Sequence, residues 1–164
     1  MIALQFTEVK PFMNKLLREE MFDHFLLSEA TIVNGVTYSI DGHIAKNTRD
    51  EYPDEFPDAL TPYGKVRPIL FEMVKGNRTP SYMKFIFCLS SENVKRTIAS
   101  IESNCDPDTV SGMYINATFQ GEFILVTTGV SYSVFVKDRA LEQEWDRFVK
   151  LFFTKNQLYF ETMS

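Results

Sequence analysis

The segment HFLLSEATIVNGVTYSIDGHI, residues 24–44, decides the fold class. Asn34-Gly35 at its centre is the strongest short signal for a hairpin turn, because both central residues of a type I′ turn need a positive φ. After this turn apolar and polar side chains alternate: Val36, Thr37, Tyr38, Ser39, Ile40 and Asp41. Such alternation is typical of a strand with one buried face. The segment therefore predicts a β-hairpin with an apolar and a polar side.

Helical and extended patterns follow one another on both sides of this hairpin. Apolar residues recur at helical spacing in four segments, about 8–20, 65–75, 91–101 and 138–155. Strand patterns occupy six further segments, 2–6, 82–89, 112–119, 122–128, 130–137 and 158–160. We therefore expect an α+β fold with mostly antiparallel sheet and about four helices.

The order strand, helix, hairpin occurs twice, over about 2–44 and about 83–128, and the two hairpins turn at Gly35 and Gly121. Such a repeat indicates two similar half-sheets that share one core, although so short a pattern also arises by chance. The order resembles half of each module in the DNA sliding clamps, which is an analogy of fold alone. Clamps present basic helices to the duplex, whereas the first and third helices predicted here mix basic with acidic residues.

The length of 164 residues predicts one domain, 1–164, with one insertion. The insertion is the segment 46–61, where acidic residues lie among prolines. It contains Asp50, Glu51, Pro53, Asp54, Glu55, Pro57 and Asp58. Prolines prevent regular strand pairing and the like charges repel, so we expect an exposed, mobile loop.

The charge and composition of the chain limit which binding partners and which cellular compartment are expected for the protein. The chain has 17 basic and 22 acidic residues, a net charge of −5, which argues against binding to duplex nucleic acid or to anionic membranes. The start of the chain does not read as a signal peptide, and no apolar run approaches the ~18 residues of a membrane span. Cys88 and Cys105 lack metal-site spacing, and Cys88 lies in an apolar run that predicts a buried thiol. We expect a cytoplasmic protein.

One candidate site follows from the hairpin. Pairing outward from a two-residue turn joins residues whose numbers sum to 69, so Ser28 faces Asp41 and Leu26 faces His43. His24, Asp41 and His43 then share one face, with the histidines about 7–8 Å apart as diagonal neighbours. These side chains could hold a divalent metal ion with an open position, or transfer protons near neutral pH. The alternative is the solvated polar face of a half-exposed hairpin.

A second candidate site is a basic run that contains a single acid, Glu72. Its cations are Lys65, Arg67, Lys75, Arg78 and Lys84. A phosphate-bearing ligand or RNA could bind such a surface. The alternative is a solvated helix face that the neighbouring acidic loop neutralises.

Three stretches, FLLSEATIVNGVTYSIDG, KFIFCLSSENV and LVTTGVSYS, resemble an uncharacterised family of small Firmicutes proteins with a domain of unknown function. This resemblance covers most of the chain and implies a cytoplasmic protein. It carries no activity and no site residues.

The sequence leaves three functional interpretations. The first is a small binding or interaction domain without catalytic activity, with a protein partner or a second copy as ligand. The second is a metal-assisted hydrolase that uses His24, Asp41 and His43. The third is a nucleic-acid or nucleotide-binding protein that uses the basic run at 65–84. No dinucleotide fingerprint, phosphate loop or zinc-protease motif is present to decide among them.

Overall fold

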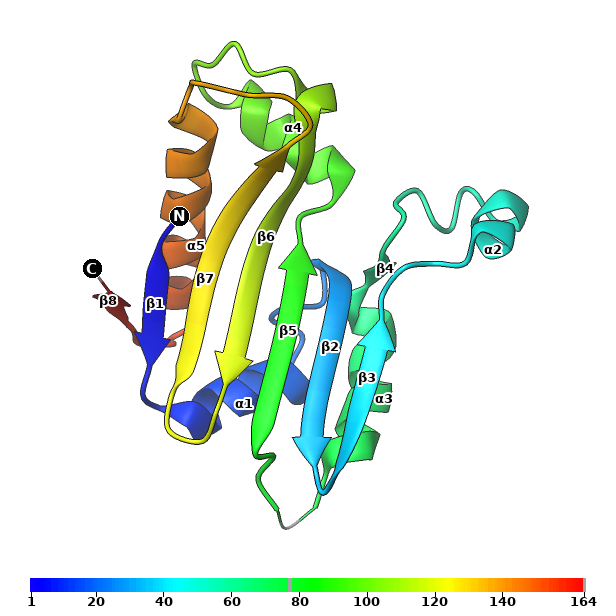
Figure 1. Ribbon diagram of the computed structural model, residues 1–164, viewed down its shortest axis with the longest axis vertical. Helices are drawn as coiled ribbons and strands as arrows, with labels where there is room; N and C mark the ends of the chain where they lie inside the picture. The colour runs from blue at the N-terminus through cyan, green and yellow to red at the C-terminus, as the bar shows by residue number, and fades with distance from the viewer. Residues whose placement is uncertain (77, 164) are drawn as a thin grey trace.

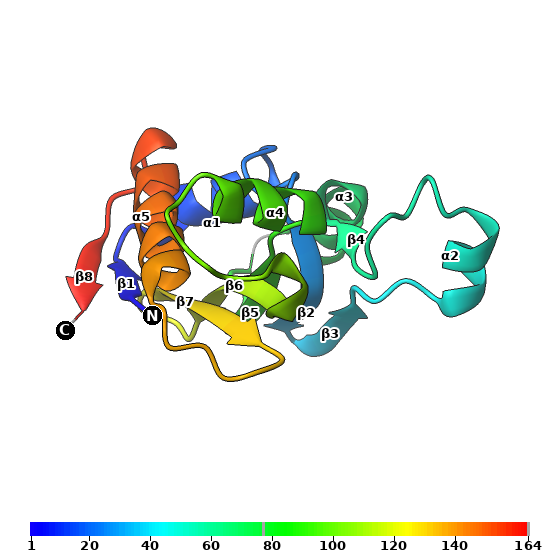
Figure 2. The same cartoon turned by 90° about the horizontal axis from the view of Figure 1, so that it is seen from above.

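The computed structural model describes residues 1–76 and 78–163, which form an α+β fold with helices packed on one face of an antiparallel sheet (Figures 1 and 2). The strands are β1 (Ala3–Phe6), β2 (Leu26–Asn34), β3 (Val36–Asp41), β4 (Thr61–Pro62), β5 (Tyr82–Cys88), β6 (Val110–Phe119), β7 (Ile124–Tyr132) and β8 (Glu161–Met163). The helices are α1 (Val9–Leu17), α2 (Lys46–Glu51), α3 (Tyr63–Val74), α4 (Ser91–Ala99) and α5 (Ala140–Lys155), with a 3₁₀ turn at Pro107–Thr109. The predicted fold class is confirmed.

The sheet runs in the order β3-β2-β5-β6-β7-β1-β8, and β4 pairs with the start of β2. Each of the pairings is antiparallel. Figure 2 shows α1, α3, α4 and α5 together on one side of this sheet, whereas α2 lies away from it, beyond β3. One face of the sheet is therefore covered and the other faces solvent, as antiparallel sheets permit.

Aromatic side chains fill the space between the sheet and the helices. Phe22 stacks on Phe87 with ring centroids 4.8 Å apart, and Phe6 meets Phe12 edge-on at 4.9 Å. Phe153 of α5 approaches Phe6 at 4.8 Å. Aromatic pairs at these distances add to the free energy gained from burying their area. Phenylalanine side chains of α1, α5, β1 and β5 therefore meet in one core.

The two strand–helix–hairpin units both exist along the chain, as β1-α1-β2-β3 and β5-α4-β6-β7. Their first strands are placed differently. β5 lies between β2 and β6, whereas β1 lies beyond β7 and pairs with β8 on its other side. The units therefore interleave in one sheet and do not form two equivalent half-sheets.

The turn between β2 and β3 is tighter than predicted. Asn34 pairs with Val36, so only Gly35, with φ of +78°, remains between the strands. Paired residue numbers consequently sum to 70, and Asp41 faces Glu29 where Ser28 was expected. A glycine at a positive φ explains why the chain can reverse here without a second turn residue.

Three details of the predicted elements differ in the structure. The predicted strands 122–128 and 130–137 are one strand, β7, which continues through Gly129 and ends at Tyr132. The predicted loop 46–61 contains a short helix, α2, because its first six residues precede the first proline. The last strand also lies three residues later than the expected 158–160.

Long-range polar contacts fix α3 beside α1. The hydroxyl of Tyr63, at the start of α3, donates a 2.8 Å hydrogen bond to the carbonyl oxygen of Leu16. Burial raises the pKa of this hydroxyl, so it stays protonated and able to donate. Arg67 forms a two-pronged contact with Asp23, through Nε at 2.7 Å and Nη2 at 3.1 Å. Both contacts hold α3 against the end of α1.

The arm, defined here as residues 44–60, leaves the sheet at the β3 edge (Figure 1). Its base is closed by a bridge between His43 and Leu60 and by the Ile44 amide, which donates to the carbonyl of Ala59 at 2.8 Å. Below this base, the Gly42 amide donates to the carbonyl of Ser28, where β2 has an irregular register. Gly42 therefore lies directly on the backbone of β2 and sets the direction of the arm.

No helix within residues 1–76 and 78–163 is long and apolar enough to cross a lipid bilayer.

The contact of Gly42 with β2 yields a prediction for stability. A Cβ atom at Gly42 would lie 1.6 Å from the Leu27 carbonyl oxygen, whereas one at Gly129 would meet nothing within 4 Å. Backbone cannot move aside as a flexible side chain can, so Gly42→Ala should destabilise the fold by about 2 kcal/mol or more. Gly129→Ala is the matched control and should change the unfolding free energy much less. Urea unfolding of both variants checks this, and equal losses would contradict the proposed contact.

Candidate functional site

A cavity of about 560 Å³ lies between α1, the end of α3 and the turn between β6 and β7. We call it the groove. Its lining is Val9, Lys10, Met13, Asn14, Leu17, Arg18, Phe71, Val74, Lys75, Gly76, Arg78, Thr79, Pro80, Phe119 and Gly121. Cavities of roughly 300–1,000 Å³ are the usual size for ligand sites.

The floor of the groove is apolar because of helical spacing. Val9, Met13 and Leu17 recur every four residues, so they form one stripe along α1. From the opposite side, Phe71 and Val74 of α3 reach the same cavity. Phe71 is only partly buried, so the cavity exposes an aromatic ring as well as aliphatic groups.

The rim of the groove carries four cations and, among the described residues, no carboxylate. Lys10 and Arg18 come from the two ends of α1, and Lys75 and Arg78 follow α3. The guanidinium of Arg18 lies 5.3 Å from the centroid of the Phe71 ring, a distance typical of cation–π contact. The groove therefore combines an aromatic floor with positive charge.

These cations have few partners of opposite charge. Lys75 contacts Glu72 at 2.6 Å on the exposed side of α3. Within 1–76 and 78–163, no ion pair involves Lys10, Arg18 or Arg78. Unpaired cations that converge on one cavity favour an anionic ligand.

The basic run predicted from the sequence is divided by the fold. Lys65 pairs with Glu55 of the arm at 3.1 Å, and Lys84 lies 3.9 Å from Glu29. Arg67 is bound to Asp23, as described above. Only Lys75 and Arg78 of the run reach the groove. The other two groove cations, on α1, were not singled out as a site, because α1 also carries acidic neighbours and nothing local indicates that α3 ends beside it.

The predicted histidine site is brought together only in part. His43 Nδ1 lies 2.7 Å from Asp41 Oδ1, and the His43 amide donates to the same oxygen at 2.9 Å. This backbone hydrogen bond is the main reason that the pKa of Asp41 is lowered, with the His43 side chain adding to it. His24 is outside β2, in the exposed turn that follows α1.

The predicted metal ligands therefore do not gather. The residue numbers of paired β2 and β3 residues sum to 70 and not to 69, which shifts the pairing by one residue. In addition, β2 begins only at Leu26, so His24 is not paired with β3 and does not align with His43. In the described part of the chain, no three His, Cys, Asp or Glu side chains are arranged to hold a metal ion. Asp41 and His43 form an exposed local contact at the end of β3.

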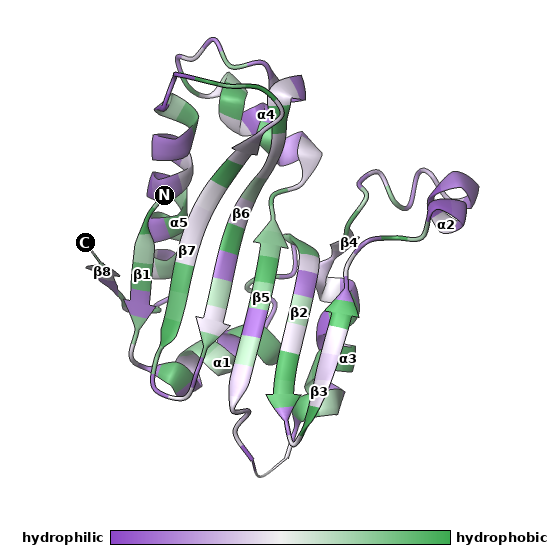
Figure 3. Ribbon diagram, viewed as in Figure 1, coloured by the Kyte–Doolittle hydropathy of each residue, from purple (hydrophilic) through white to green (hydrophobic). Residues whose placement is uncertain are grey.

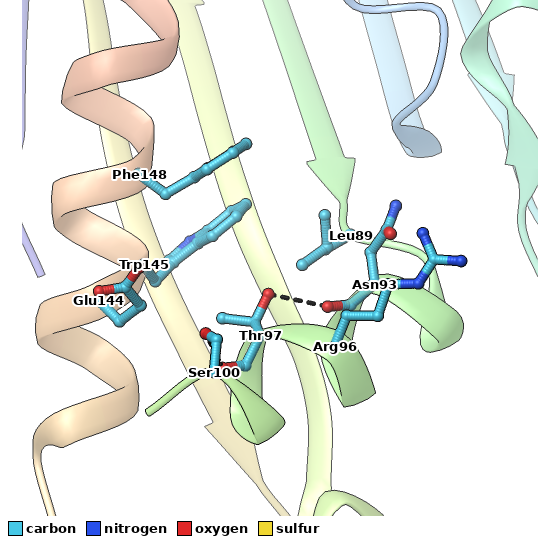
Figure 4. A pocket seen from close by; sticks show the side chains of 8 residues that line it. All are labelled: Leu89, Asn93, Arg96, Thr97, Ser100, Glu144, Trp145 and Phe148. Carbon is cyan, nitrogen blue, oxygen red and sulfur yellow. Dashed lines mark hydrogen bonds between the residues drawn. The ribbon is translucent and has the colours of Figure 1, made fainter. Parts of the chain in front are cut away.

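A second cavity, of about 360 Å³, lies between α4 and α5 (Figure 4). Trp145 and Phe148 form one wall as a stacked pair, with ring centroids 5.5 Å apart. On the opposite wall, the Thr97 hydroxyl donates to the backbone carbonyl of Asn93 at 2.8 Å, the dashed line in Figure 4. Ser100 likewise donates to the carbonyl of Thr97. Because these hydroxyls are bound within α4, the cavity has fewer groups available for a ligand than the groove.

A third cavity, of about 410 Å³, lies beside Cys88 at the start of α4. Burial raises the pKa of the Cys88 thiol, which disfavours the thiolate that a nucleophile requires. Asp58, which also lines this cavity, accepts a hydrogen bond from the Ser91 amide at 3.2 Å. The cavity therefore belongs to the structural support of α4.

Comparison with models of known protein families shows which family the chain belongs to. A model for a family of unknown function, DUF5721, matches residues 15–161. No curated protein and no solved structure is significantly similar to the chain. The match spans Arg18, Lys75 and Arg78 of the groove, whereas Lys10 precedes it. Because the match covers most of the chain, the protein belongs to DUF5721, a family of unknown function.

Proposed function

We propose that this protein is an interaction module without catalytic activity, and that its groove binds an acidic protein segment with an apolar anchor. The observation that carries the proposal is the lining of the groove, in which four cations surround an apolar floor. A ligand that satisfies both features needs negative charge and an aromatic or aliphatic group close together. Short acidic peptides with one large apolar residue meet this requirement.

The two features make different contributions to binding. Burial of one large apolar side chain contributes roughly 1.5–3 kcal/mol. Partly exposed ion pairs contribute less, about 0.2–1 kcal/mol each, but they select the charge of the ligand. The floor therefore supplies affinity and the cations supply specificity. Arg18 takes part in both, because it lies over the Phe71 ring.

Several observations favour a peptide over the other interpretations. The net charge of −5 opposes long nucleic acids, and Lys65, Arg67 and Lys84 are engaged with carboxylates. The described lining of the groove contains no His, Cys, Asp or Glu to serve as base or nucleophile. We further infer that the module works in the cytoplasm, where the free thiols of Cys88 and Cys105 would remain reduced.

Peptide binding tests the proposal directly. The probe is a fluorescein-labelled peptide with one tryptophan between two runs of three glutamates, and the reference peptide has glutamine in place of each glutamate. We expect the acidic probe to bind more tightly, with an affinity that falls as salt is added. Replacing both Lys10 and Arg18 by Gln should weaken binding about fivefold or more, since two ion pairs are lost. Fluorescence anisotropy measures both effects.

The matched control for this test is Lys137→Gln, which removes an exposed cation in the loop before α5. It should leave the affinity unchanged. Equal binding of the two peptides, or an equal effect of the groove and control variants, would rule out the groove as the binding site.

A further inference from the structure

The sheet ends on one side in β3, whose outer edge pairs with no other strand in the described part of the chain. β3 is the edge strand, and among residues 1–76 and 78–163 it pairs only with β2. It contains neither Pro nor Lys, the residues that commonly block an edge, and its Val36 side chain is 59% exposed. The opposite edge, β8, is half as long, with three residues against six. β3 is therefore the edge that is open to strand addition.

Exposed apolar side chains lie next to this edge. Val36, Tyr38 and Ile40 pair with Asn34, Ile32 and Ala30, so they point to the helix-covered side of the sheet. On that side, α3 exposes Ile69 and Met73, which are one turn apart on the flank opposite Phe71. Figure 3 shows hydrophobic colour on parts of α3 and of β3, whereas α2 is mostly hydrophilic. A strand added to β3 would cover these groups.

The arm has the chemistry that the groove requires. Asp50, Glu51 and Asp54 are exposed on either side of Tyr52, which is itself 50% exposed. Glu55 and Asp58, by contrast, are held by Lys65 and by the Ser91 amide. The arm thus presents three carboxylates around one aromatic ring.

We propose that the partner is a second copy of this chain. Two copies pair their β3 edges antiparallel about a two-fold axis, and the arm of each copy covers the groove of the other. This proposal rests on the function proposed above, and it identifies the acidic segment as the arm of the second copy. An isologous contact of this kind closes on itself, so it gives a dimer and not a filament.

The positions of the arm and the groove agree with such an axis. In Figure 1 the arm extends outward from the upper end of β3, whereas α3 ends and Lys75 follows at the lower end. A two-fold axis perpendicular to the sheet at the middle of β3 exchanges the two ends. It therefore brings the arm of one copy to the end where the other copy has its groove cations. Tyr52 would enter the apolar floor, and the carboxylates would face Lys75 and Arg78.

The interface would join three surfaces of different character. The β3 ladder supplies backbone hydrogen bonds, the Ile69–Met73 flank of α3 supplies apolar area, and the arm–groove contact supplies charge complementarity. Stable interfaces bury roughly 1,200–2,000 Å² in total. An edge strand of six residues alone would not reach this size, which is why the arms are needed.

Sedimentation velocity of the full chain over a range of concentrations tests the edge contact. We expect a monomer–dimer equilibrium. Val36→Lys should raise the dissociation constant at least tenfold, because it places a cation in the strand-pairing surface while leaving the folded monomer intact. Met163→Lys on β8, where the native side chain is 44% exposed, is the control and should dimerise like the natural protein. A chain that remains monomeric at millimolar concentration would overturn the proposal.

A charge exchange tests the arm–groove contact. One variant carries Asp50→Lys with Glu51→Lys, and another carries Lys75→Glu with Arg78→Glu. In each variant alone the substituted positions face residues of like charge in the partner, so we expect dimerisation to weaken at least tenfold. In a mixture both contacts are complementary again, and a heterodimer should form with near-natural affinity. Dimerisation that ignores all four substitutions would refute arm–groove pairing.

Failure of this inference can be told apart from failure of the proposed function. If the chain is a strict monomer, but the glutamate peptide still binds in a manner that depends on Lys10 and Arg18, the groove binds another protein and the second copy is excluded. If neither dimerisation nor peptide binding is seen, both proposals fall.

Discussion

The structure depends on the burial of one face of an antiparallel sheet against α1, α3, α4 and α5. Phe12, Phe22 and Phe153 interlock with Phe6 and Phe87 across this interface. Such packing covers the central part of one face but leaves the outer edge of β3 uncovered. The open β3 edge is thus a direct consequence of how the core is built.

Two sets of specific contacts position the groove and the arm. The Tyr63–Leu16 hydrogen bond and the Arg67–Asp23 ion pair hold the first half of α3 against the end of α1, and the far end of α3 lines the groove. The close contact of Gly42 with β2 sends the chain away from the sheet at the same edge. The same fold therefore positions both the groove and the arm. Their opposite charges agree with binding of the arm of one copy in the groove of another.

Elements that depend on local side-chain patterns could be predicted from the sequence, whereas sites that depend on contacts between distant residues could not. The α+β class and α5 follow from the spacing of side chains such as Leu141 and Trp145, which are buried as expected. The three residues of the histidine site are not brought together, because Gly35 alone forms the turn and because β2 begins at Leu26, after His24. The groove was not predicted, because Arg18 and Arg78 are 60 residues apart and only the tertiary fold makes them neighbours.

Amide hydrogen exchange at two protein concentrations can detect the proposed dimer contacts at the edge, the arm and the groove in one sample. If two copies pair as proposed, exchange slows at high concentration in β3, in the arm and around Lys75 and Arg78 together, with no change in β8. Exchange that is independent of concentration in all of these segments, or slowing confined to β8, would contradict this pairing.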